Sequence, residues 1–242
     1  MQHEIVLKPE ILGIIKGLPI TNTLLVSWIV MTVITILSII ATWRIKMVPG
    51  GVQNLFELMI DFGYTTVEDL AGIEKAKVFF PFVMTFFFFI LFSNFIGLFP
   101  GFATITFGGK PLLRSMNSDL NMTLALALFS AFLTHFFAIK YLGIVDYLKK
   151  WFTLNPIFLF VGLLELVGEV TKIVSLSFRL FGNIFAGEVV LATVSSIFAF
   201  IIPLPFYFLE IIVGFVQAAV FMMLTLVFMV LLSEKHGAEE HN

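Results

Sequence analysis

The chain has 242 residues, of which 60% are hydrophobic and only 12% charged, and its mean hydropathy is +1.06. A soluble domain carries about 25% charged residues, so this composition excludes a soluble globular protein and indicates an integral membrane protein. The net charge of −2 gives no sign of nucleic-acid binding, and the absence of cysteine excludes disulfides and thiolate metal sites. The apolar segments have the length of spanning helices rather than of alternating barrel strands, so we predict an all-α polytopic fold in a single membrane domain.

Residues 1–20 mix charged and apolar residues without a signal-peptide pattern, and we predict an external arm there. The first span is predicted over 24–43, with Trp28 and Trp43 near its ends as interfacial anchors. A Pro-Gly-Gly break follows. Apolar residues then recur at helical spacing along one side, with polar residues on the other, so 52–72 is predicted to be an amphipathic interfacial helix.

Two middle spans are predicted, over 78–99 and 119–145. The first is uncharged and rich in phenylalanine, and on composition alone its run Phe86 to Phe89 would be interpreted simply as a bulky surface facing lipid. At the start of the second, Asp119 fits a helix N-cap, and a place in an ion path is an equally open interpretation. The histidine within this span, His135, is interpreted as packed or hydrogen-bonded rather than as a proton relay.

From 156 to 202 the chain runs without a strong break, over a length of about 70 Å at 1.5 Å per residue. That is about twice the thickness of a bilayer core. Hydropathy leaves open two short spans or one long and steeply tilted helix. The last span is predicted over 206–233, followed by a polar tail over 234–242.

Five spans with the amino terminus outside place the carboxyl terminus in the cytoplasm. Eight basic residues are then cytoplasmic: Arg44, Lys46, Lys75, Lys77, Lys140, Lys149, Lys150 and Lys235. Four are outside: Lys8, Lys16, Lys110 and Arg114. This excess agrees with the positive-inside rule.

Arg179 lies in an apolar run between Lys172 and Glu188, at or near membrane depth. A guanidinium group does not deprotonate in proteins, and holding its charge there costs about 2.5–3.5 kcal/mol on insertion scales. We therefore predict that this cation has a function. Ser175 and Asn183, four residues away on either side, flank it on the same helix face.

Other charged and polar residues form a pattern around this arginine. On the long segment the members are Glu165, Glu169 and Lys172, and on the last span they are Glu210 and Gln217. Buried carboxyl groups exchange protons near neutral pH because desolvation raises their pKa, whereas an arginine does not. The pattern thus predicts an inner half-path (Glu165, Glu169, Lys172) and an outer half-path (Asp119, Glu188, Glu210). The alternative is that these charges only pair with one another inside a helix bundle.

The run Arg-Leu-Phe-Gly-Asn-Ile-Phe-Ala-Gly-Glu, from Arg179 to Glu188, closely resembles the signature of subunit a of F-type ATP synthases. Three further stretches are similar to the same family: Pro49 to Asn54 with Glu57, Ser93 to Pro100, and Asp119 to Thr123. The resemblance implies a stator subunit with a long, tilted C-terminal helical hairpin that curves around a rotor ring. It favours the single long helix over two short spans.

The resemblance also implies partners and roles. The partners are the ring of subunit c, the peripheral-stalk subunit b, the rest of the ATP synthase complex and lipid of a bacterial plasma membrane. Arg179 faces a rotor carboxylate, promotes release of its proton and blocks a leak between two half-channels. Asn183 and Gln217 belong to the outer half-channel and Ser175 to the inner one, and the family varies at the positions of Gly187 and Glu210.

No phosphate-binding loop of the Gly-x-x-x-x-Gly-Lys type occurs, so we expect no catalytic site in this chain, no cofactor and no metal. Nucleotide chemistry is expected on partner subunits. The main alternative function is a secondary transporter that binds an anionic substrate at Arg179, which predicts internal repeats and paired broken helices that the sequence lacks. A voltage sensor needs repeated arginines, and an intramembrane hydrolase needs motifs that are absent.

Overall fold

The computed structural model describes residues 9–15, 17–43, 50–99, 105–107, 110–151, 156–197 and 201–234. Its elements in chain order are β1 (Ile11–Ile15), β2 (Leu18–Thr21), α1 (Asn22–Trp43), α2 (Gly51–Gly97), β3 (Thr106–Phe107), β4 (Lys110–Pro111), the 3-10 turn η2 (Met116–Ser118), α3 (Leu120–Leu142), α4 (Ile144–Trp151), α5 (Pro156–Ile197) and α6 (Pro203–Leu232). Five of these helices are long and apolar enough to cross a membrane. The prediction of an all-α polytopic membrane protein is confirmed.

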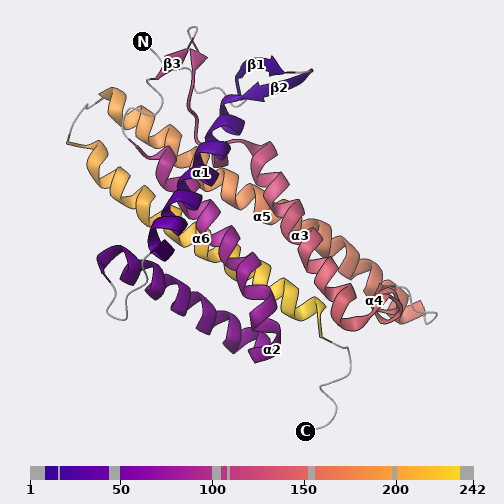
Figure 1. Ribbon diagram of the computed structural model, residues 1–242. Helices are drawn as coiled ribbons and strands as arrows, with labels where there is room; N and C mark the ends of the chain where they lie inside the picture. The colour runs from indigo at the N-terminus through magenta and orange to yellow at the C-terminus, as the bar shows by residue number, and fades with distance from the viewer. Residues whose placement is uncertain are drawn as a thin grey trace.

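Two short antiparallel hairpins lie at the same end of the molecule, above the helices in Figure 1. Strands β1 and β2 belong to the predicted external arm, where the sequence pattern indicated no strand. Gly17 makes their turn possible with φ of 85°, a conformation that costs glycine little. Residues 1–8 and 16 of that arm lie outside the described residues.

Helix α2 joins the predicted amphipathic helix to the predicted first middle span. Gly72 separates its two halves with φ of 75° and ψ of 160°, which are not helical values. The first half then folds back along the second, and Gly63 lies so close to Met84 that a β-carbon would collide with its sulfur. The apolar face of the amphipathic half is therefore partly covered by the chain itself.

Glycine and proline also account for the ends of the later helices. Helix α3 ends at Leu142, short of the expected 145, because Gly143 adopts φ of 82° and the chain turns into α4. Helix α6 begins earlier than expected, with Pro203 and Pro205 in its first turn, where a missing N–H has no partner to lose. Residues 198–200 lie outside the described residues.

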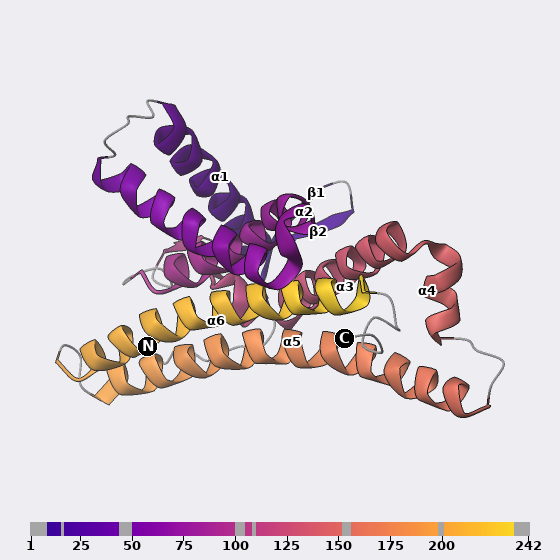
Figure 2. The same ribbon diagram turned by 90° about the horizontal axis from the view of Figure 1, so that it is seen from below.

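The long segment forms one helix rather than two. The part of α5 counted as spanning, Phe160–Ile197, has 38 residues. At 1.5 Å per residue it is about 57 Å long, against a hydrocarbon core of about 30 Å, so it must cross the membrane at a steep tilt. Figure 2 shows α6 running antiparallel beside it.

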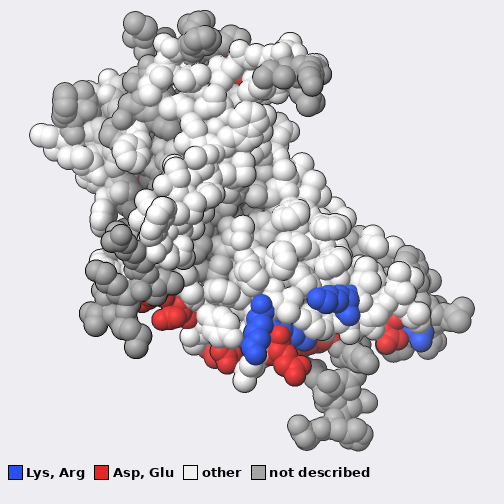
Figure 3. All heavy atoms as spheres, viewed as in Figure 1, with Lys and Arg blue, Asp and Glu red and all other residues white. Residues whose placement is uncertain are grey.

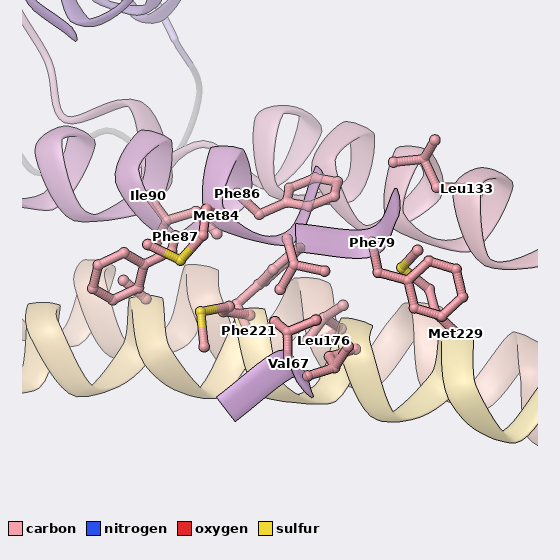
Figure 4. Packing of buried hydrophobic residues seen from close by; sticks show 14 of the residues in the cluster. Val67, Phe79, Met84, Phe86, Phe87, Ile90, Leu133, Leu176, Phe221 and Met229 are labelled. Carbon is pink, nitrogen blue, oxygen red and sulfur yellow. The ribbon is translucent and has the colours of Figure 1, made fainter. Parts of the chain in front are cut away.

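The core lies where α2, α3, α5 and α6 meet, as Figure 4 shows from close by. Phe86 and Phe87 are buried there, and the Phe86 ring centroid is 5.4 Å from that of Phe221 on α6. The interpretation from composition alone, that this phenylalanine run faces lipid, does not hold for these two residues. An apolar membrane helix offers the same residue types to lipid and to its neighbours, so composition alone does not distinguish the two.

Helix α5 contributes little to that core. Of the residues in its most apolar window only 11% are buried, against 50% in α2 and 44% in α6. In Figure 2 it lies along one edge of the molecule, with no other helix of the chain beyond it. One face of α5 is therefore open to lipid or to a partner.

Charged side chains gather along one edge in Figure 3, at the end of the molecule that holds α4 and the bend of α2. The face above this band is almost free of charge in the same view. This is the arrangement expected of a membrane surface and the apolar zone beside it.

Candidate ion path on the long hairpin

A groove of about 440 Å³ follows α5 and opens on its free side. Its lining includes Thr171, Lys172, Ser175 and Arg179 from α5, and Leu224 and Phe228 from α6. The side chain of Arg179 is exposed, and in the part of the chain that the structure describes it has no hydrogen bond or ion pair. A permanent cation on an open apolar face indicates that its counter-charge comes from another molecule.

On one side of Arg179 along α5, Lys172 and Glu169 form an ion pair with an Nζ to Oε1 distance of 2.6 Å. Glu169 is buried. The Lys172 ammonium also lies 4.6 Å from the ring centroid of Phe228, a cation–π contact that the sequence did not reveal. Ser175 lies on the groove wall, and Glu165 is half-buried further towards the α4 end.

On the other side of Arg179, Asn183 donates from Nδ2 to Oε1 of Gln217, at 2.7 Å. This contact joins α5 to α6 one turn beyond the arginine. The Nε2 atom of Gln217 is buried without a hydrogen-bond partner among the described residues. An unpaired buried amide is costly, so this atom is expected to bind water.

Further along the hairpin, Glu188 on α5 and Glu210 on α6 come into electrostatic contact. The Glu210 carboxylate occupies the space where a β-carbon on Gly187 would lie, so the absence of a side chain at 187 gives it room. Glu188 also interacts with Ser118 of η2 and with the charge of Arg114. Sequence spacing did not show that the loop before α3 reaches the hairpin.

Asp119 serves as the N-cap of α3 by accepting from the Asn121 backbone N–H at 3.0 Å. Its other oxygen, Oδ2, accepts from Thr23 Oγ1 on α1, also at 3.0 Å. The carboxylate is only 4% exposed. Capping thus explains the hydrogen bond to one carboxylate oxygen of Asp119. It does not explain why the whole group is buried beside α1.

Polar residues that the sequence analysis did not assign to the path continue it. Asn94 on α2 accepts from Asn117 Nδ2 at 2.7 Å and donates to the Gly214 carbonyl of α6 at 2.9 Å. Asn117 Oδ1 is buried without a partner among the described residues. The one signal for Asn94 in the sequence is an amide within an otherwise uncharged span.

The described residues thus form two polar groups separated by Arg179. Among these residues no three histidine, cysteine or acidic side chains come together as a metal site. Over residues 24–230 the chain matches the family model described as ATP synthase A chain.

The chain belongs to the ATP synthase A chain family.

Bacterial relatives support this assignment over nearly the full length. The ATP synthase subunit a of Trichlorobacter lovleyi is 35% identical over 211 residues, which cover 86% of this chain and 85% of the relative. That of Syntrophobacter fumaroxidans is 35% identical over 223 residues, covering 89% and 83%. That of Geobacter sulfurreducens is 36% identical over 206 residues, covering 84% and 83%. The resemblance stated from the sequence motifs is confirmed, and this member of the ATP synthase A chain family is a multi-pass membrane protein.

The two interpretations of Asp119 can be separated by a pair of substitutions. Asparagine caps helices about as well as aspartate but carries no charge, whereas alanine removes both properties. If the carboxylate belongs to an ion path, Asp119→Asn will lower ATP-driven proton pumping almost as far as Asp119→Ala. If Asp119 only caps α3, Asp119→Asn will pump normally and Asp119→Ala will lose about 1 kcal/mol of stability. Pumping in membrane vesicles and thermal unfolding in detergent measure the two effects.

Proposed function

We propose that this chain is the stator subunit of the membrane sector of a rotary ATP synthase, where it provides two proton half-channels to the carboxylates of a rotor ring. The observation that carries the proposal is the position of Arg179, exposed on the open face of α5 between two separate polar groups. A cation in that place attracts an ionised carboxylate from a partner and repels an incoming proton.

The outer half-channel comprises Asp119, Asn183, Glu188, Glu210 and Gln217. A proton that enters there neutralises a rotor carboxylate, which can then move from the polar groove into lipid at lower cost. Unpartnered buried amide atoms at Asn117 and Gln217 support water along this route, because water satisfies such groups.

The inner half-channel comprises Glu165, Glu169, Lys172 and Ser175. A rotor carboxylate that returns towards Arg179 is favoured in its charged form and releases its proton on this side. The Glu169–Lys172 pair holds a carboxylate at the groove wall, where it can receive that proton. Since a guanidinium group does not pass protons on, Arg179 also separates the two half-channels.

The driving force is consistent with this role. One elementary charge that crosses 100 mV releases about 2.3 kcal/mol, so several protons per ATP are required. A rotor that combines the free energy of successive single-proton steps meets that requirement. The nucleotide chemistry lies on other subunits of the complex.

The partners of the proposed subunit are the subunit c ring on the open face of α5, the peripheral-stalk subunit b and the rest of the ATP synthase complex. The membrane is the bacterial plasma membrane, with the amino terminus outside and the carboxyl terminus in the cytoplasm. The band of charge beside α4 and the bend of α2 includes Lys75, Lys77, Lys140 and Lys149, and it supports a cytoplasmic position for that end.

Proton pumping by the assembled complex tests the proposal. Inverted membrane vesicles that carry the complex with this chain should acidify on addition of ATP, and vesicles from cells that lack only this chain should not. After the catalytic head is stripped off, a potential should drive passive proton flux only through the first kind of vesicle. Equal pumping by both kinds would contradict the proposal, and potential-driven uptake of an anion without pumping would favour a transporter.

A further inference from the structure

Helix α4 brings two titratable rings together at the end of the inner half-channel. His135 of α3 and Tyr147 of α4 form a hydrogen bond with a distance of 3.0 Å between Nδ1 and the hydroxyl oxygen. Figure 1 shows α4 turned back against the ends of α3 and α5. From the sequence alone, His135 was interpreted as a packed or hydrogen-bonded side chain rather than as a proton relay.

The local backbone fixes this contact. Gly143 adopts φ of 82° and reverses the chain between α3 and α4, so that Tyr147 returns to His135. The carbonyl group of Trp151 then occupies the space where a β-carbon on Gly162 of α5 would lie. Because glycine has no side chain, Gly143 and Gly162 permit α4 to approach both α3 and α5.

Trp151 closes the cluster from the far side. Its ring centroid is 6.4 Å from that of His135 and 6.1 Å from that of Tyr147, both in edge-to-face arrangements. The indole nitrogen lies near the Tyr147 hydroxyl and is buried, yet no described residue satisfies it with hydrogen-bond geometry. This unpaired donor indicates a water molecule at the hydroxyl.

The cluster is electrostatically coupled to the Glu169–Lys172 pair. Both members of the pair act on the His135 ring, and Glu169 also acts on Tyr147. These groups come from α3, α4 and α5, and α6 adds the uncharged ring of Phe228 against Lys172. Burial and the negative charge of Glu169 raise the pKa of the Tyr147 hydroxyl, which therefore keeps its proton at neutral pH.

Partial exposure distinguishes these residues from ordinary core side chains. His135 and Tyr147 are both half-buried, whereas Glu169 is only 8% exposed. The two rings therefore lie within the electrostatic influence of a buried carboxylate and are themselves partly exposed at the α4 end of the molecule. Packing alone requires neither the ring nitrogen nor the hydroxyl.

We propose that His135 and Tyr147 are the exit of the inner half-channel and carry protons between Glu169 and the cytoplasm. This inference rests on the proposed function. Protonated Glu169 passes its proton through water to Nε2 of the neutral imidazole, which becomes an imidazolium and leaves the carboxylate paired with Lys172. The imidazolium then gives its Nδ1 proton to the Tyr147 hydroxyl oxygen as that hydroxyl releases its own to water. This leaves a neutral ring protonated at Nε2, and proton exchange with water restores the starting tautomer.

Four variants of the complete complex in inverted vesicles test this exit. His135→Ala removes the relay ring, Tyr147→Phe removes only the hydroxyl, and Trp151→Phe keeps a large ring but removes the indole donor. Phe136→Ala is the matched control, because Phe136 neighbours His135 on α3 and is 51% exposed. The measurements are ATP-driven acidification across a range of pH, passive proton flux after removal of the head, and the amount of assembled complex.

We expect His135→Ala to lower both fluxes about tenfold, less than the hundredfold that a positioned proton-transfer group contributes, because water substitutes in part. Added imidazole should restore most of the loss, which it cannot do for a packing defect. Tyr147→Phe should cause a smaller loss and change the pH profile. Trp151→Phe should cause a loss no larger than that of Tyr147→Phe, because it removes only the donor to the water at the hydroxyl, while Phe136→Ala should retain the flux.

An assembled His135→Ala complex that pumps like the unaltered one would overturn the relay, as would a loss that imidazole leaves unchanged. If His135→Ala fails to assemble, Tyr147→Phe decides, and an unchanged rate and pH profile in that variant would also overturn it. Failure of the proposed function itself would look different, because the unaltered complex would then not pump at all.

Discussion

Replacement of Arg179 by alanine is expected to abolish ATP-driven proton pumping by the assembled complex. The side chain is exposed in the groove of α5 and lacks a partner among the described residues, so its removal leaves no internal charge unpaired. The loss should therefore fall on function rather than on folding. Removal of one preorganised electrostatic group from a reacting site commonly costs about a hundredfold or more in rate, and we expect at least that reduction.

The same variant should raise the passive proton leak of vesicles stripped of the catalytic head, because the cation no longer separates the two half-channels. Lys77→Ala is a suitable control, since it removes an exposed positive charge from α2, away from the groove. The control should pump and leak like the unaltered complex. Near-normal pumping by Arg179→Ala in an assembled complex would refute the proposed mechanism.

Replacement of Gly187 by alanine is expected to lower pumping by between about ten- and a hundredfold, the range in which small displacements of reacting groups act. The new methyl group would occupy the place of the Glu210 carboxylate, which must then move. Because that carboxylate is the end of a flexible side chain, the helices can keep their packing. Assembly should therefore be preserved while the contact between Glu188 and Glu210 is lost.

A double-mutant cycle separates this effect from a general disturbance of the hairpin. Gly187→Ala should add almost nothing to the loss caused by Glu210→Ala, because the displaced group is already absent. Gly182→Ala is a matched control on the same helix, since no atom lies within 4 Å of the position of its β-carbon. Fully additive losses from Gly187→Ala and Glu210→Ala would mean that Gly187 acts through something other than Glu210.

Local spacing predicted what lies on one helix. Glu165, Lys172 and Arg179 follow one another at intervals of seven residues. Because that spacing is a property of a single helix, the sequence sufficed to place these residues along one side of α5. The ion pair between Glu169 and Lys172 could be predicted for the same reason. Lys172 is three residues after Glu169, so the two side chains meet within one helical turn.

Contacts between helices could not be predicted in this way. Glu188 meets Glu210, and Asn183 meets Gln217, only at one longitudinal register of α5 against α6. At that register Gly187 leaves room for the Glu210 side chain, and hydropathy does not encode such a fit. The contact of Ser118 with Glu188 depends in addition on the path of a loop, for which no periodicity exists.

Single glycines account for much of the remaining difference between the predicted and the observed fold. A Gly72 with positive φ converts two predicted helices into a folded pair, and a similar Gly143 starts the short helix α4, which was not predicted after the span over 119–145. Without α4, His135 is an isolated histidine in an apolar helix, and nothing in the sequence brings Tyr147 to it. The interpretation of His135 as a packed or hydrogen-bonded side chain included such a bond, but the sequence could not name Tyr147 as its partner.

A newly inserted copy of the chain presents the Arg179 guanidinium to lipid before any rotor carboxylate is available. On insertion scales that exposure costs about 2.5–3.5 kcal/mol, and little else on α5 compensates because so few of its residues are buried. In the proposed assembly, docking of a rotor carboxylate beside Arg179 would offset this cost, so the charge required by the mechanism would also favour association with the rotor.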